Sequence, residues 1–135
     1  MKVIRYILLP FIVLYSGMTL GFAQSAPTDM LQDMAIPLMD GLTENQDEAF
    51  LFDSPDGSII AAQASGTVSP KAAFDYYRVV LPSLGWVIED DNTKGLICED
   101  GAEYCFMAVR DEESLVLNIL SEGQNSVLTY SLSPN

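Results

Sequence analysis

The reactive side chains of this chain are two cysteines and 19 carboxylates, because its 135 residues include no histidine. The lack of histidine excludes Ser–His and Cys–His nucleophiles and the imidazole ligands that zinc usually takes. The sequence contains no glycine-rich phosphate loop either. Acid–base catalysis by paired carboxylates, as in glycosidases, is therefore the enzymatic alternative that remains open.

The candidate carboxylates lie in short polar segments, where such groups are ordinarily solvated. They are Glu89, Asp90, Asp91, Glu99 and Asp100. Nothing in the sequence sets them apart from surface charge, so we expect a protein that is not an enzyme and holds no cofactor. The alternative is a carboxylate-based hydrolase acting on an extracytoplasmic polymer. The side-chain oxygens near Asp90 are hard ligands of the kind that calcium prefers. Their spacing does not fit an EF-hand loop, so no metal site is predicted.

Cys98 and Cys105 are the only cysteines. If a hairpin turn is centred on Gly101 and Ala102, the two cysteines stand opposite each other on neighbouring strands. A directly opposed pair lies within disulfide range, and an exported protein meets an oxidising compartment. We therefore predict a Cys98–Cys105 disulfide; the alternatives are two buried free thiols, or a shift in register that separates the cysteines. A redox role is not favoured, because the pair is not Cys-x-x-Cys and has no evident basic neighbour.

The N-terminal segment indicates the compartment. A short basic start is followed by an apolar run over residues 6 to about 20, which ends in small residues. This order is typical of a secretory signal peptide, and a membrane span needs roughly 20 apolar residues with few breaks. We predict a signal peptide at residues 1–23, cleaved between Ala23 and Gln24, with no stable membrane insertion afterwards. A retained anchor is the alternative.

Cleavage would make an already acidic chain more acidic. All 19 acidic residues follow Ala23, whereas two of the six basic residues precede it, so the formal net charge changes from −13 to −15. Such a charge repels nucleic acid and anionic lipid, and we expect neither as a partner. High net charge supplies solubility without any partner, and a basic partner or divalent cations outside the cell are the alternative.

The mature chain divides at about Ala49. Residues 24–48 are predicted to form a leader that lies over the domain or stays mobile, with a short helix over residues 28–35 capped by Thr28. Residues 49–135 have the length and apolar content of one α+β domain. Three methionines of the leader are interpreted as flexible packing filler: Met30, Met34 and Met39.

The domain is predicted to begin with a hairpin and a helix. Strand-like residues 49–52 and 58–68 flank a turn in which Gly57 accepts positive φ. Ser69 is a good N-cap before Pro70, and Gly85 is a left-handed stop. The helix between them carries an apolar stripe, widened by Ala73 and Val80, at spacings of three and four residues: Phe74, Tyr77, Leu81 and Leu84.

Short β segments alternate with polar breaks after the helix. They are predicted at residues 86–89, 94–99, 103–110, 115–120 and 126–132. The short connections are typical of antiparallel hairpins, and one helix cannot cover both faces of a sheet this wide. We therefore predict an α+β fold: one main helix packed on a curved antiparallel β-sheet, built as a β-hairpin, the helix and a β-meander, with one face partly exposed to solvent.

Residues 74–86 read Phe-Asp-Tyr-Tyr-Arg-Val-Val-Leu-Pro-Ser-Leu-Gly-Trp. An aromatic helix that ends in Leu-Gly-Trp before several strands resembles a segment of small uncharacterised secreted or periplasmic bacterial proteins. The turn at residues 52–57 is similar in style, and the resemblance spans about residues 50 to 132. It implies an α+β domain of the cell envelope and brings no activity, ligand or catalytic residue. We interpret Tyr77 and Trp86 as core residues.

The alternation of side chains on several strands predicts an apolar sheet face that the helix leaves uncovered. The candidate interaction surface consists of Val116, Leu120, Leu128, Tyr130 and Leu132. We therefore predict an exported, non-catalytic module, periplasmic or secreted, which binds an envelope protein or a small ligand through this face. An accessory subunit tethered by residues 24–48 is a further alternative.

Overall fold

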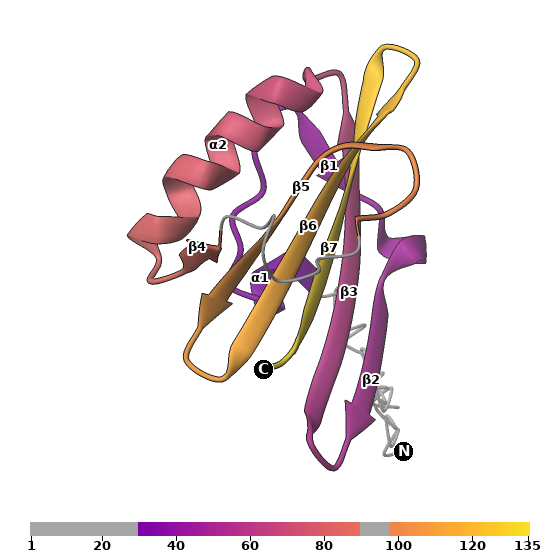
Figure 1. Cartoon of the computed structure of the whole chain (residues 1–135). Helices are drawn as coiled ribbons and strands as arrows, with labels where there is room; N and C mark the ends of the chain where they lie inside the picture. Colours follow the sequence, from indigo (N-terminus) through magenta and orange to yellow (C-terminus); the bar gives the residue numbers. More distant parts are fainter. Residues whose placement is uncertain (1–29, 90–97) are drawn as a thin grey trace, which may run out of the picture.

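The computed structural model describes residues 30–89 and 98–135 of the chain (Figure 1). The predicted signal peptide with its Ala23–Gln24 cleavage site, the Thr28 cap and most of the predicted strand at residues 94–99 lie outside the described residues. None of the described helices is long and apolar enough to cross a membrane.

The fold is an antiparallel seven-stranded sheet with one main helix on one face (Figure 1). Its strands run in the order β1-β3-β7-β6-β5-β4, and β2 pairs with β3 beside β1. The predicted α+β class and its terminal meander are confirmed. In chain order the elements are α1 (Met30–Asp33), β1 (Leu42–Glu44), the 3-10 helix η1 (Gln46–Glu48), β2 (Phe50–Ser54), β3 (Gly57–Gly66), α2 (Pro70–Ser83), β4 (Val87–Glu89), β5 (Ala102–Arg110), β6 (Glu113–Glu122) and β7 (Asn125–Pro134).

The main helix, α2, begins and ends where its capping residues predict. The Ser69 side chain accepts a hydrogen bond from the Ala72 N–H at 3.1 Å, and Pro70 takes the first turn, where its missing N–H costs nothing. Pro82 lies in the last turn, one residue before the helix ends. Gly85 then adopts φ +88°, a left-handed conformation that residues with a Cβ rarely adopt.

The predicted β2–β3 hairpin is also confirmed. A two-residue turn, Pro55 and Asp56, joins the strands, and Gly57 adopts φ +134° at the start of β3. The Ser58 hydroxyl donates to the Asp53 carboxylate at 2.5 Å across the turn, which stabilises this local structure.

The core lies between α2 and the face of the sheet that α2 covers. Tyr77 and Trp86 are buried, as interpreted from the sequence. Leu84 differs from its predicted place in the buried stripe: it is the C-cap of α2, and 41% of its surface is exposed. The sheet supplies alternating side chains from β3, β5, β6 and β7: Ala62, Ala64, Phe106, Ala108, Leu115, Leu117, Ile119, Leu128, Tyr130 and Leu132.

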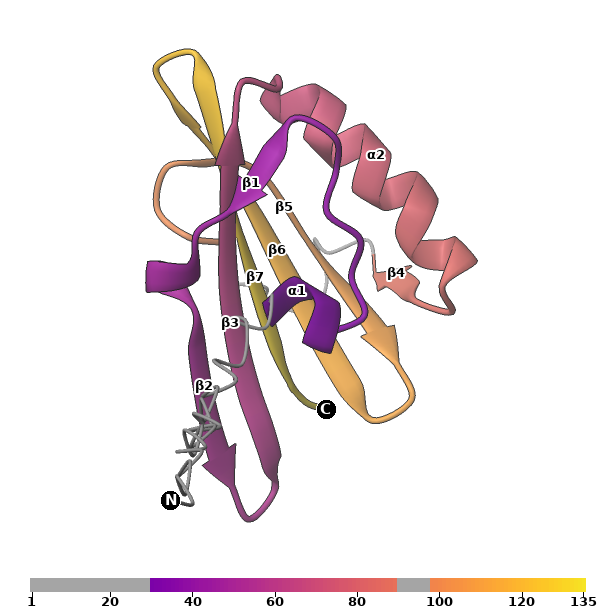
Figure 2. The same ribbon diagram turned by 180° about the vertical axis from the view of Figure 1, so that it is seen from behind.

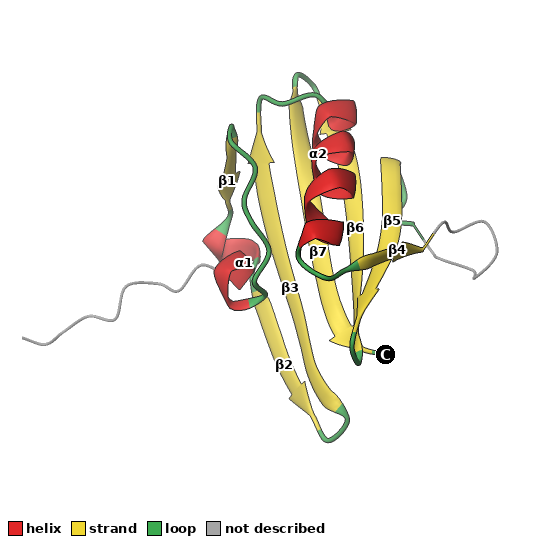
Figure 3. Cartoon of the chain, turned by 90° about the vertical axis from the view of Figure 1, so that its left-hand side faces the viewer, coloured by secondary structure: helices red, strands yellow, loops and turns green. Residues whose placement is uncertain are grey.

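The described part of the predicted leader, residues 30–48, packs onto the same sheet. Figures 2 and 3 show α1 on the same face as α2. The β1 strand, which the sequence analysis did not predict, pairs with β3 from Leu42 opposite Gly66 onward. Buried residues from this segment complete the core: Leu31, Met34, Ile36 and Leu42. Met30 and Met39 pack against the core and are partly buried, so the interpretation of the methionines as packing residues is confirmed.

The Cys98–Cys105 disulfide is present, but the hairpin from which it was predicted is wrong. The neighbours of β5 are β4 and β6, and Cys105 lies opposite Asn118 of β6. On the other side of β5, β4 pairs only with Met107–Val109, and the disulfide reaches Cys105 from a residue that lies outside any strand. Cys98 and Glu99, the described end of the predicted strand at residues 94–99, form no strand.

Candidate functional site

The structure divides the predicted interaction surface between the two faces of the sheet. Leu128, Tyr130 and Leu132 are buried, at 0, 1 and 4% exposure, on the face that α2 covers, and so they offer no binding surface. Val116 and Leu120 lie on the opposite face, which we call the open face, and are half-buried. The alternation of apolar and polar side chains along β7 was correctly identified, but the apolar side chains face the helix. The alternate residues, which include Thr129 and Ser131, are polar, and this was the sequence signal that they face solvent.

A strap formed by residues 98–101 crosses the open face (Figure 1). Its disulfide joins it to β5, and the Glu99 N–H donates to the Asn118 side-chain oxygen on β6 at 2.9 Å. The Thr129 hydroxyl on β7 donates to the Glu99 carboxylate, also at 2.9 Å. The strap is thus attached to three neighbouring strands and covers part of the face that was expected to be free.

Apart from Val87 on β4, the large exposed apolar residues of the described strands gather instead on the β2–β3 hairpin. We call Phe50, Leu51, Phe52 and Ile59 the hairpin patch; their exposed fractions are 54, 53, 52 and 38%. Phe52 lies opposite Ile59 in the β2–β3 register, so Phe50, Phe52 and Ile59 share the open face. The two phenylalanine rings are parallel, with centroids 6.5 Å apart.

The hairpin patch lies beside a free sheet edge. In the described part of the chain, β2 pairs with β3 and with no other strand, so its outer edge presents unpaired backbone groups. Proteins usually protect such edges with charges, proline or very short strands. The opposite edge follows this rule, because β4 is three residues long, whereas β2 has five residues of which Asp53 alone is charged.

Acidic residues flank this edge. Asp47 and Glu48 precede β2, and Asp53 and Asp56 lie at its turn. The basic residues within the described ranges lie on α2 and β5 rather than on the hairpin: Lys71, Arg78 and Arg110. Lys71 is paired with Asp75 at 2.6 Å, and the Arg110 guanidinium lies 4.3 Å from the centre of a Trp86 ring.

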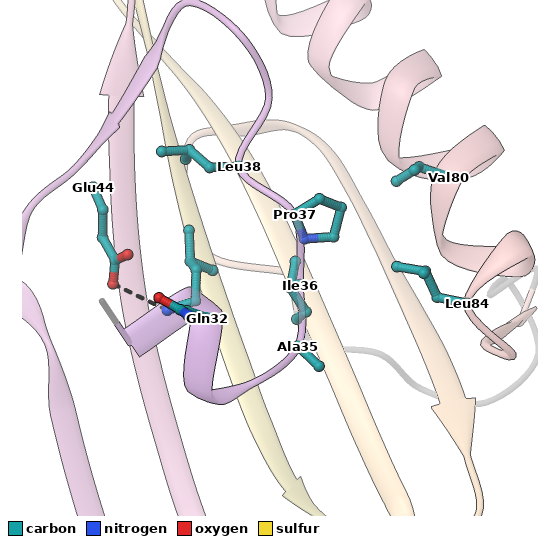
Figure 4. Close-up of a pocket in the computed structure, with 9 residues that line it drawn as sticks. Gln32, Ala35, Ile36, Pro37, Leu38, Glu44, Val80 and Leu84 are labelled. Atoms are coloured by element: carbon teal, nitrogen blue, oxygen red, sulfur yellow. Dashed lines mark hydrogen bonds between the residues drawn. The ribbon is translucent and has the colours of Figure 1, made fainter. Parts of the chain in front are cut away.

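A groove lies between the N-terminal segment and α2 (Figure 4). This apolar groove has a volume of about 500 Å³. Its position depends on the packing of residues 30–48 over the domain, which is why sequence reasoning missed it. The groove is lined by Leu31, Gln32, Ala35, Ile36, Pro37, Leu38, Glu44, Val80 and Leu84.

Two tyrosines tie the groove segment to the core. The Tyr77 hydroxyl donates to the Pro37 carbonyl at 3.0 Å and accepts from the Met39 N–H at 3.3 Å. Because the single hydroxyl proton of Tyr77 is used in the hydrogen bond to the Pro37 carbonyl, Tyr130 is the donor in the 2.8 Å bond between the two hydroxyls. Burial raises the pKa of both tyrosines, because it penalises the charged phenolate. The pair therefore acts as a neutral structural bridge.

The described carboxylates among the hydrolase candidates belong to separate parts of the fold. Glu89 ends β4, Glu99 and Asp100 belong to the strap, and Asp90 and Asp91 lie outside the described residues. Within residues 30–89 and 98–135, no cluster of three or more acidic or cysteine side chains is placed to hold a metal ion. No protein-family model, curated protein or solved structure matches the chain.

Proposed function

We propose that this protein is an exported, non-catalytic binding module of the cell envelope, and that it takes up an extended segment of a partner protein along β2. The observation that carries the proposal is the hairpin patch beside an unpaired strand edge. The signal-like N-terminal sequence and the Cys98–Cys105 disulfide support export, because disulfides persist in oxidising compartments.

Strand addition uses both features of this edge. A peptide in extended conformation gains affinity from main-chain hydrogen bonds to β2 and specificity from contacts with alternate side chains. Phe50 and Phe52 are alternate residues on one face, so they are spaced to contact alternate apolar side chains of an added strand. Aromatic side chains are enriched at protein interfaces because each buries a large area.

The charge around β2 indicates the chemistry of the partner segment. Asp47, Glu48, Asp53 and Asp56 flank the hairpin patch in a chain of formal net charge −13. A segment with lysine or arginine on either side of its apolar residues complements this field, and an acidic segment is repelled. Association should therefore slow as salt is added.

Selection from a display library of random short peptides tests the proposal. We expect the selected peptides to combine alternating apolar residues with basic flanks, and to perturb the amide signals of β2 in NMR spectra. A double variant, Phe50→Ser with Phe52→Ser, should weaken their binding by about tenfold or more, which corresponds to about 1.4 kcal/mol. A matched double variant on other surfaces, Val79→Ser with Val87→Ser, should bind like the unmodified protein; these valines are 76 and 63% exposed.

Selected peptides without alternation, or an affinity that the Phe50 and Phe52 changes leave unaltered, would contradict strand addition at this edge. No observation on the described residues favours the carboxylate-based hydrolase, and Asp90 and Asp91 lie outside them.

A further inference from the structure

The apolar groove has two walls from distant parts of the sequence. Ile36 and Pro37 form one wall and face Val80 and Leu84 of the α2 wall (Figure 4). Its volume of about 500 Å³ lies in the range of small-molecule sites, which are mostly apolar with a few polar groups. In this groove the polar side chains are Gln32 and Glu44.

The groove leaves apolar surface uncovered on both walls. Leu84 continues the apolar stripe of α2, yet it is 41% exposed, and Leu38 on the other wall is 39% exposed. Buried residues of the same stripe, such as Leu81, pack against the sheet, whereas no described residue covers the side of Leu84 that lines the groove. An apolar ligand body would remove both leucines from water.

The walls are fixed before any ligand arrives. The Tyr77 hydroxyl binds the Pro37 carbonyl and the Met39 N–H, which joins the groove segment to α2. Leu31 and Ile36 are 2 and 3% exposed, so their side chains are held in the core. A preformed site costs little ordering when it binds.

Glu44 supplies the charge of the groove. One of its carboxylate oxygens accepts from the Leu31 N–H at 3.1 Å, and a carboxylate has capacity for further hydrogen bonds. No lysine or arginine lines the described groove, so the carboxylate has no cationic partner there. A ligand that carries a cationic nitrogen complements this charge, whereas an anionic ligand opposes it.

We propose that the apolar groove binds a small amphiphile whose apolar body covers Leu38 and Leu84 and whose cationic nitrogen pairs with Glu44. This site is separate from the hairpin patch on β2, and the ligand proposal does not depend on the proposed protein partner.

Three probes with the same eight-carbon alkyl chain test the proposal on the full chain: octylamine, octanol and nonanoate. Titration calorimetry should show that octylamine binds about tenfold more tightly than nonanoate, with octanol between them. Glu44→Gln should reduce this preference to about twofold or less. The matched control, Glu48→Gln, removes an exposed carboxylate outside the groove and should keep the preference.

The apolar contact is tested on α2. Leu84→Ser should weaken all three probes by about tenfold, and Val79→Ser, on the same helix but outside the groove, should leave them unchanged. Absence of saturable binding, equal affinity for amine and carboxylate, or indifference to Leu84→Ser would overturn the proposal. Nuclear Overhauser contacts from the Leu84 methyl groups to the chain before Met30, or to a second copy, would assign the groove to another occupant and overturn it as well.

Discussion

The hydroxyl oxygens of Tyr77 and Tyr130 lie 2.8 Å apart and join α2 to β7 inside the core. Their rings meet edge to face, with centroids 5.6 Å apart. Through Tyr77 the same bridge reaches Pro37 and Met39, so three segments that are distant in sequence share one buried polar network. Such a network rigidifies a core when each of its members is satisfied.

The bridge makes the protein sensitive to alkaline pH. Burial raises the pKa of both tyrosines above the ordinary value of about 10, so below that pH both are neutral in the folded and the unfolded chain. Above pH of about 10 the unfolded chain loses phenolic protons that the folded chain retains. The free energy of unfolding should therefore fall as pH rises, by up to about 1.4 kcal/mol per pH unit for each tyrosine.

Urea titrations between about pH 8 and pH 11, followed by the fluorescence of the single tryptophan, Trp86, measure this slope. Tyr130→Phe is the control, because it removes one of the two groups and should reduce the slope by about half. An equal slope in that variant would show that the bridge does not cause the alkaline loss.

The two tyrosines should differ in their importance for stability. Tyr77→Phe leaves the Pro37 carbonyl, the Met39 N–H and the Tyr130 hydroxyl without their partner, and it should cost about 2–4 kcal/mol. Tyr130→Phe removes one hydrogen bond and leaves both partners on the groove segment satisfied, so it should cost about 1 kcal/mol. Urea midpoints at neutral pH measure both changes. The reverse ranking would contradict the assignment of Tyr77 as the centre of the network.

The local signals of the sequence predicted the local structure. Ser69, Pro70 and Gly85 fix the ends of α2, because their effects act within one helical turn. The turn at Pro55 and Asp56 similarly fixed the hairpin, since its register follows from the loop itself.

The features that the sequence missed depend on long-range contacts. Tyr77 contacts Pro37 across 40 positions, and β1 is three residues long, which is too short for an alternation pattern. The register of Cys98 failed because β5 pairs with later and earlier strands, β6 and β4, rather than with its own N-terminal flank. The groove and the free edge of β2 both arise from contacts of this kind.

The disulfide should stabilise the strap and, with it, the whole fold. Cys98 and Cys105 are seven positions apart, and a loop of this size gains about 2–3 kcal/mol by the chain-entropy estimate. A double variant, Cys98→Ser with Cys105→Ser, should lower the free energy of unfolding by that amount in urea titrations. Reducing agent should destabilise the unmodified protein to the same extent and leave the double variant unchanged; an effect of reductant on both would point to a cause other than this bond.

Replacing Ala35 with glycine should stabilise the protein. Ala35 adopts φ +54° two residues after the end of α1, where the Ile36 N–H donates to the Leu31 carbonyl at 2.9 Å and the Ala35 N–H to the Gln32 carbonyl at 3.0 Å. Glycine is usual at this position, because a Cβ costs about 1 kcal/mol in the left-handed region. Ala35→Gly should therefore raise the free energy of unfolding by about 0.5–1 kcal/mol, part of the relief being offset by the greater freedom of the unfolded chain.

The same substitution at exposed Ala72 in α2 provides the matched control and should have the opposite sign. Ala72 is helical, so Ala72→Gly should cost up to about 1 kcal/mol, since glycine loses more backbone freedom on folding than alanine does. Urea titrations of both variants followed by Trp86 fluorescence compare them directly. A similar decrease in the free energy of unfolding at both positions would contradict the left-handed conformation of Ala35 and the way in which α1 ends beside the groove.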